Sequence, residues 1–105
     1  MRELSHPARD ALRMTDVLHA LSDPTRLKLV ACLAGGEEQR CGLLYSSIPK
    51  STLSHHFRVL REAGVILQRP QGVSTLNSLR REDLNARFPG LIDAILCASE
   101  EPPCW

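Results

Sequence analysis

The sequence predicts a mainly α-helical fold that carries one two-stranded β-hairpin. Apolar residues recur at helical spacing before residue 64 and again after residue 84, and two β-prone runs lie between. A chain of 105 residues corresponds to one domain and is too short to enclose a large active site. Its 43% hydrophobic content is typical of globular proteins, and its apolar runs are shorter than the ~20 residues of a membrane span.

The first predicted helix covers residues 14–21. Val17, Leu18 and Leu21 form an apolar stripe along it, and Thr15 is the expected N-cap. The start of the chain carries both charge signs and has no apolar signal segment, so we expect a cytoplasmic protein.

The second predicted helix lies within SDPTRLKLVACLAGG. Ser22 or Asp23 is the expected cap, Pro24 suits the first turn, and two glycines after residue 34 end the helix. The expected inner face consists of Leu27, Val30 and either Leu33 or Ala34.

A short helix is predicted at 41–45, and after the polar break SSIP a longer one follows at 51–63. Leu53, Phe57 and Leu60 define the inner side of the longer helix, and Gly64 ends it. On a helical wheel the opposite side carries Ser51, Ser54, His55, Arg58 and Glu62, with Arg61 at its margin.

The hairpin is predicted from runs at 65–69 and 73–79 around a three-residue turn, Pro70-Gln71-Gly72. A last apolar pattern has helical spacing but is interrupted by Pro89 and Gly90, which predicts one kinked helix or two short ones. Its apolar members are Leu84, Phe88, Leu91, Ile92, Ile95 and Leu96. We expect one domain over 1–98 and a flexible tail over 99–105.

This order of elements is that of a winged helix-turn-helix, in which the helix after the break enters the DNA major groove. The charge distribution agrees, although the net charge is only +1. Residues 50–81 hold six basic groups and one acidic group, whereas residues 82–105 hold one basic and five acidic groups. A cationic middle segment is typical of a surface that binds a polyanion.

Two segments, ALSDPTRLKLV and STLSHHFRVLREAGVI, resemble the ArsR/SmtB family of small bacterial transcriptional repressors. The likeness extends from about Leu18 to Leu96. It implies a homodimer formed by the first and last helices, repression through double-stranded operator DNA, and release by an inducer whose identity is unknown.

The family's DNA-reading positions fall here on Lys50, Ser51, Thr52, Ser54, His55 and Arg58, which nearly coincide with the outward face from the wheel. Arginine and lysine pair with phosphates or a guanine edge, and the short hydroxyl side chains allow close approach. Arg69 on the hairpin is a further candidate DNA contact, and Arg80 and Arg81 follow it on the expected surface. The competing interpretation of this helix face is an ordinary solvated surface. The competing interpretation of the whole protein is a protein-binding module that kept the fold without specific DNA binding.

Metal binding and catalysis are not expected, nor is a cofactor. His55 and His56 are adjacent, so their side chains point about 100° apart on a helix, and Ser54 with His55 lacks an orienting acid. The metal sites of family members are incomplete here, because Cys41 stands alone and the last helix offers Asp93 without a histidine.

Cys32 and Cys97 form a candidate thiol sensor, since they loosely resemble a cysteine pair of some oxidant-sensing relatives. In those relatives the first thiol falls one position earlier, where Ala31 stands here. The alternative is that both cysteines only pack in the core and that Cys104 belongs to the tail. Dimerisation is expected through two stripes that one small domain cannot cover alone: Val17, Leu18 and Leu21 with Leu91, Ile92 and Ile95.

Overall fold

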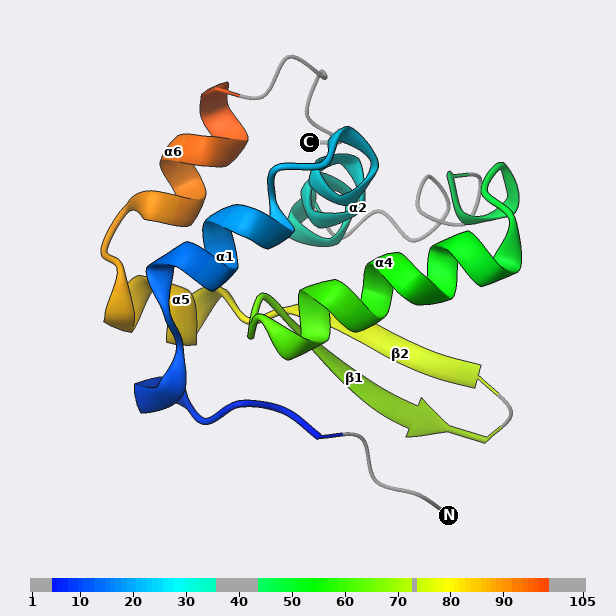
Figure 1. The fold of residues 1–105 in the computed structure, drawn as a ribbon, viewed down its shortest axis with the longest axis horizontal. Coiled ribbons are helices and arrows are strands. Elements are labelled where there is room, and N and C mark those ends of the chain that lie inside the picture. Colours follow the sequence, from blue (N-terminus) through cyan, green and yellow to red (C-terminus); the bar gives the residue numbers. More distant parts are fainter. Residues whose placement is uncertain (1–4, 36–43, 73, 99–105) are drawn as a thin grey trace.

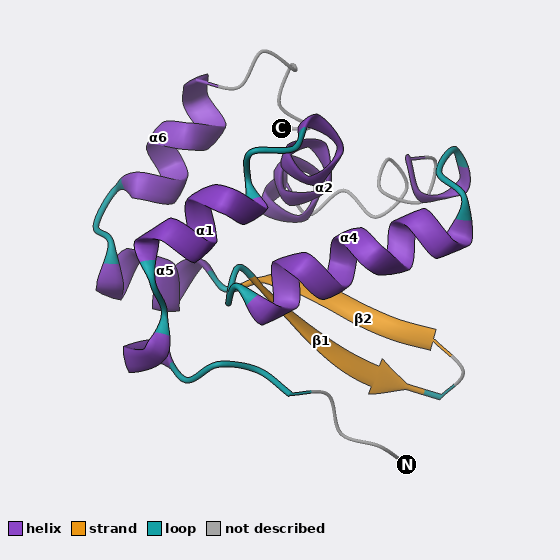
Figure 2. Ribbon diagram, in the orientation of Figure 1, coloured by secondary structure: helices purple, strands orange, loops and turns teal. Residues whose placement is uncertain are grey.

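The structure, a computed structural model, describes residues 5–35, 44–72 and 74–98. The helices lie above and to the left of an antiparallel hairpin, which projects below α4 (Figures 1 and 2). This arrangement confirms the predicted fold class, a winged helix, and we call the hairpin the wing. In chain order the elements are η1 (Arg9–Ala11), α1 (Met14–Ala20), α2 (Pro24–Gly35), α4 (Lys50–Glu62), β1 (Ile66–Gln71), β2 (Ser74–Leu79), α5 (Arg81–Arg87) and α6 (Leu91–Ala98).

Helix α2 begins as its sequence predicts. The Asp23 side chain accepts a hydrogen bond from the Arg26 backbone N–H at 3.0 Å, and Pro24 occupies the first helical position. The prediction for α1 is wrong in one detail: α1 starts at Met14, so Thr15 lies inside the helix and Arg13 precedes it without a side-chain cap. Residues 41–43 of the short helix predicted at 41–45 lie outside the described residues. Residues 44–46 are helical.

Helix α4 buries the inner side that the periodicity predicts. Phe57 and Leu60 are buried and Leu53 is partly buried. The chain then turns at Gly64, whose φ of +85° favours glycine. A Cβ at this position would lie 2.0 Å from Leu12 Cδ2, so the close approach of the N-terminal segment also requires glycine.

The wing differs from its prediction at the turn. Gln71 pairs with Ser74 and Pro70 pairs with Thr75, so the first strand extends into the predicted three-residue turn, whereas the second strand begins at Ser74. Proline is tolerated there because alternate residues of an antiparallel pair direct their N–H groups away from the partner strand. The tight connection therefore lies between residues 71 and 74, with Gly72 at φ +62°.

Within the described residues, one hydrophobic core joins α1, α2, α4, the wing, α5 and α6. Its fully buried large side chains come from residue 12, these helices, β1 and the residue before β1: Leu12, Val17, Leu29, Val30, Leu60, Val65, Ile66, Leu84 and Ile92. The final apolar pattern forms two helices, because Gly90 with φ +78° separates α5 from α6. Among the described residues, no helix has the length and apolar content that a membrane span needs.

The expected dimerisation stripes are only partly available on the surface. Val17 and Ile92 are each 1% exposed and Leu21 is also buried, so these three side chains belong to the hydrophobic core. Their burial corrects the sequence-based expectation. Leu18 remains 44% exposed, and Leu91 and Ile95 are half-buried.

Candidate nucleic-acid interface

The outward face of α4 is open to solvent over its whole length. Its exposed side chains include all six positions that the sequence assigned to DNA reading: Lys50, Ser51, Thr52, Ser54, His55 and Arg58. Burial of the opposite side against the core fixes which way this face points.

A buried arginine sets the place of α4 relative to α1 and α2. The Arg26 side chain, on α2, donates from Nε to the Ala20 carbonyl at 2.6 Å and contacts His56 Nδ1 on α4 through Nη1 at 3.2 Å. Because a guanidinium only donates, Nδ1 of His56 is the acceptor in this contact. His56 is therefore a buried, hydrogen-bonded imidazole.

An aromatic contact packs against the second half of α4. The rings of Tyr45 and Phe57 meet edge to face, with centroids 5.4 Å apart. Tyr45 belongs to the helical residues 44–46, so this contact joins the two helices on either side of the turn at 47–49.

Five of the six basic side chains in residues 50–81 fall into two groups, and the sixth, Arg61, donates a hydrogen bond to Gln68. Lys50, Arg58 and Arg69 are exposed and make no ion pair within the described part of the chain. Arg80 and Arg81 are different: the side chain of Arg80 is largely buried at the base of the wing, and Arg81 pairs with Asp93. These two arginines therefore do not belong to the open cationic surface, which corrects the sequence-based expectation.

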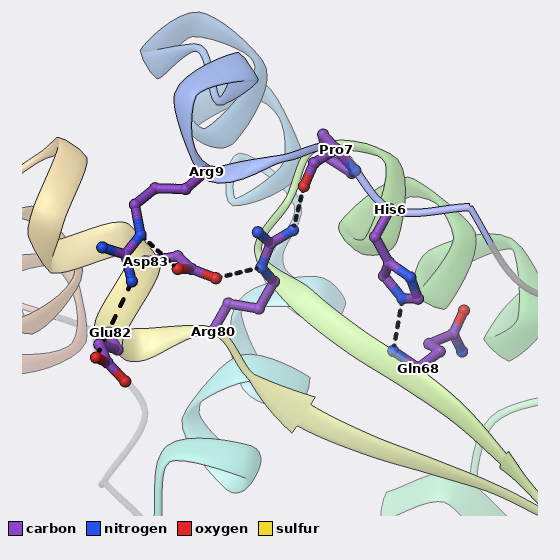
Figure 3. A network of polar contacts seen from close by, with 7 residues as sticks. All are labelled: His6, Pro7, Arg9, Gln68, Arg80, Glu82 and Asp83. Carbon is purple, nitrogen blue, oxygen red and sulfur yellow. Dashed lines mark hydrogen bonds and ion pairs between the residues drawn. The ribbon is translucent and has the colours of Figure 1, made fainter.

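Arg80 joins the N-terminal segment to the wing and α5 (Figure 3). It donates to the Pro7 carbonyl at 2.8 Å and to Asp83 at 2.9 Å, and Arg9 reaches the other oxygen of Asp83 at 2.7 Å. The hydrogen bonds from Arg9 and then Arg80 lower the pKa of Asp83 below its usual value. These contacts fix the orientation of the wing base.

A second carboxylate is held in its ionised form at the start of α2. Burial raises the pKa of Asp23, but the backbone N–H and the positive charge of Arg26 outweigh this effect and lower it overall. Both perturbed carboxylates thus have structural roles, and neither lies on the outward face of α4.

The histidines and cysteines give no assembled metal site in the described ranges. No group of three or more His, Cys, Asp or Glu side chains there has the arrangement that a metal ion needs. The His55 and His56 rings are tilted by 52° with centroids 5.8 Å apart, and only His55 is exposed.

The two candidate sensor cysteines lie in different environments. Cys32 on α2 is 5% exposed, whereas Cys97 on α6 is exposed, and the two are not joined as a disulfide. Cys41 and Cys104 lie outside the described residues. The structure therefore shows a buried thiol and a solvent-facing thiol.

Arg26 and Gln68 are site-supporting residues that the sequence did not predict. Their hydrogen-bond partners, His56 and Arg61, lie 30 and 7 positions away, on elements whose packing no local pattern specifies. In the sequence, Arg26 resembles an ordinary charged surface residue. Only its position near the start of a helix hinted at a structural role.

The helices on both sides of the turn, the exposed face of α4 and the wing together define a helix-turn-helix DNA-binding transcriptional regulator. The helix-turn-helix domain family matches residues 21–69.

Curated relatives agree with this class. An uncharacterized HTH-type transcriptional regulator of Bacillus subtilis, YceK, is 34% identical over 75% of this chain and 82% of its own length. The biofilm growth-associated repressor of Agrobacterium fabrum is 37% identical over 94% of this chain and 86% of its own. The arsenical resistance operon repressor of Staphylococcus xylosus is 33% identical over 69% of this chain and 70% of its own. The chain belongs to the ArsR/SmtB family of transcriptional regulators.

Proposed function

We propose that the protein is a repressor that binds double-stranded operator DNA as a homodimer, with α4 in the major groove and the wing along the DNA backbone. One observation carries this proposal: α4 presents a continuous exposed face whose cations have no acidic partner within the described residues. Two of the relatives are named as repressors, which supports repression rather than activation of transcription.

The side chains on this face suit the two kinds of DNA contact. Arg58 lies in the middle of α4 and is long enough to make a bidentate contact with a guanine edge. Lys50 at the N-terminal end of α4 and Arg69 on β1 suit phosphate contacts, which position the protein without reading sequence. Ser51, Thr52 and Ser54 allow the helix to approach the bases closely.

Dimerisation is proposed through α1 and α6. Met14 and Leu18 on α1 are 48% and 44% exposed, and Leu91 and Ile95 on α6 are half-buried. Covering these apolar side chains against a second copy would remove them from water and place two α4 helices on one side of the pair. These four side chains replace the two three-residue stripes expected from the sequence.

Release by thiol chemistry is proposed for Cys32 and Cys97. An inducer lowers operator affinity only if it binds one conformation better than another, so modification must couple α2 to the dimerising α6. Exposed Cys97 is the thiol that a reagent reaches first, whereas Cys32 needs an opening motion. The test compares operator affinity of wild type, Cys32→Ser and Cys97→Ser with and without diamide, persulfide and arsenite. A wild type that responds to none of them would exclude the sensor.

Mobility-shift titration with the DNA upstream of the protein's own gene tests the proposed function. We expect specific binding whose affinity falls steeply as salt rises, because phosphate contacts release counterions. Arg58→Ala should weaken specific binding about 10- to 100-fold, the effect of losing one bidentate base contact. The matched control Arg81→Ala removes an arginine that pairs with Asp93 and should bind like wild type. Equal weak binding of wild type to every duplex would contradict the proposal.

A further inference from the structure

A chain of hydrogen bonds connects α4 to both strands of the wing. Arg61 on α4 donates from Nη1 to Gln68 Oε1 on β1 at 2.9 Å, and Gln68 Nε2 donates to Asn77 Oδ1 on β2 at 3.0 Å. Since a guanidinium has only donors, Arg61 fixes which end of the Gln68 amide faces α4 and which end faces Asn77. The three side chains therefore have one self-consistent arrangement.

These hydrogen bonds lie beside a cleft between α4 and the wing. The cleft has a volume of about 400 Å³, and its walls include Leu53 and Phe57 from α4 and Thr75 and Asn77 from β2. Because side chains do not fill this cleft, packing there does not fix the angle between α4 and the wing. The hydrogen bonds through Gln68 instead fix the distance and direction from Arg61 on α4 to Asn77 on β2.

The backbone of Gln68 is held from the other side by the N-terminal segment. Its N–H donates to His6 Nε2 at 2.9 Å, at the outer edge of β1 (Figure 3). Gln68 is thus attached to α4, to β2 and to the N-terminal segment at once.

The next residue, Arg69, is the exposed cation of the wing. Successive side chains of a strand point to opposite faces, so Gln68 faces α4 while Arg69 faces away from it. A rotation of β1 about its axis would move the Arg69 guanidinium by more than it moves the backbone, because the side chain is long.

We infer that Gln68 is a positioning residue for DNA binding: it holds the wing at the angle to α4 from which Arg69 reaches the DNA backbone. This inference rests on the proposed function and adds a coupling between the wing and α4. Loss of the Gln68 side-chain bonds should therefore act on operator affinity through Arg69 and through no other contact.

The test combines Gln68→Met with two alanine substitutions. Gln68→Met keeps the length of the side chain, the net charge and the backbone bond to His6, and it removes both side-chain hydrogen bonds. Operator affinity is measured for Gln68→Met in the wild-type, Arg69→Ala and Arg58→Ala backgrounds, with the upstream duplex that wild type binds. Circular dichroism and thermal unfolding of each variant report whether it is folded.

We expect Gln68→Met to weaken binding about three- to tenfold in the wild-type and Arg58→Ala backgrounds, as for the net loss of one ordinary hydrogen bond. In the Arg69→Ala background the loss should fall below about twofold, because coupled residues are not additive. For Gln68→Met in the wild-type background, the slope of log affinity against log salt should also decrease in magnitude by about one, as for one lost phosphate contact. A merely structural role for Gln68 would lower thermal stability without this dependence on Arg69.

Equal losses in all three backgrounds, or no loss in any, would overturn the inference while leaving specific binding by wild type intact. A wild type that binds no duplex specifically would overturn the proposed function and this inference together. If Gln68→Met does not fold, Asn77→Ser removes only the bond between Gln68 and β2 and should show the same dependence on Arg69.

Discussion

Asp83 lies between two arginines that come from distant parts of the chain. Arg9 and Arg80 each donate to one of its oxygens, and Arg80 also holds the Pro7 carbonyl (Figure 3). One carboxylate thus attaches the N-terminal segment to the wing base and α5. The pKa of Asp83 is lowered in the folded state by these hydrogen bonds.

The lowered pKa predicts how the stability of the protein depends on pH. A carboxyl whose pKa is lower in the folded than in the unfolded state stabilises the fold fully above its unfolded pKa of about 3.9. That contribution is lost as pH falls through the folded pKa. Asp83→Asn should therefore reduce the free energy of unfolding at neutral pH, and the difference from wild type should shrink below about pH 4.

Urea unfolding of wild type and Asp83→Asn over a series of pH values measures this difference. Asp23 has a lowered pKa as well, so Asp83→Asn should keep part of the wild-type pH dependence. A difference that stays constant from neutral to acid pH would show that Asp83 contributes only packing.

Single residues show clearly what local sequence can and cannot predict. The exposed positions of α4 follow from a period of 3.6 residues, which needs no knowledge of the rest of the molecule. Arg26 and Arg80 look equally exposed in the sequence, yet both side chains are nearly buried. Their partners are carbonyls and side chains of other elements, so only the folded arrangement reveals them.

At the level of elements, the junction between α4 and β1 depends on Gly64. It combines a φ of +85° with a close approach to Leu12, which belongs to the N-terminal segment. Gly90, between α5 and α6, has a similar φ of +78°, but a Cβ added there would meet no atom of the described residues within 4 Å. A side chain at Gly64 would therefore meet both backbone strain and steric overlap, whereas one at Gly90 would meet backbone strain alone.

Gly64→Ala should destabilise the fold by about 2–5 kcal/mol, the sum of a left-handed conformation for alanine and an overpacked contact. Gly90→Ala is the matched control and should cost about 1 kcal/mol, because it carries only the conformational cost. Chemical denaturation of both variants gives the two values. Similar losses for both would show that Leu12 moves away without a cost.

The ends of elements are harder to predict than the elements themselves. Pro70 and Gly72 favour a turn locally, which is why the sequence predicts a three-residue turn. The observed register keeps Pro70 in β1 opposite Thr75, because pairing continues to Gln71 and Ser74. Pairing between strands is a non-local interaction, and it overrides the local preference at this position.

At the scale of the whole molecule, the described residues present an exposed cationic face on α4 and exposed or half-buried apolar side chains on α1 and α6. These apolar side chains include Leu18 on α1, which is 44% exposed, and half-buried Ile95 on α6. The sequence predicted these residues but also three that the core of the subunit uses. Periodicity identifies an apolar side of a helix without telling whether its own domain or a second copy covers it.

Leu18→Glu and Ile95→Glu should each dissociate the proposed dimer, because a charge at an apolar interface loses its hydration. We expect the dimer dissociation constant to rise about 100-fold or more, measured by sedimentation. Leu76→Glu is the matched control, since Leu76 on the wing is 43% exposed and the wing lies away from α6 in Figure 1. Wild type that sediments only as a monomer at micromolar concentration would contradict the dimer.

Hydroxyl-radical footprinting of the upstream DNA tests directly whether two α4 helices enter the major groove as a symmetric pair. Wild type should protect two patches on one face of the duplex, with centres about 10 base pairs apart or a multiple of that distance. Arg58→Ala should lose both patches at the same protein concentration. A single patch without symmetry, or uniform weak protection that Arg58→Ala leaves unchanged, would contradict this claim.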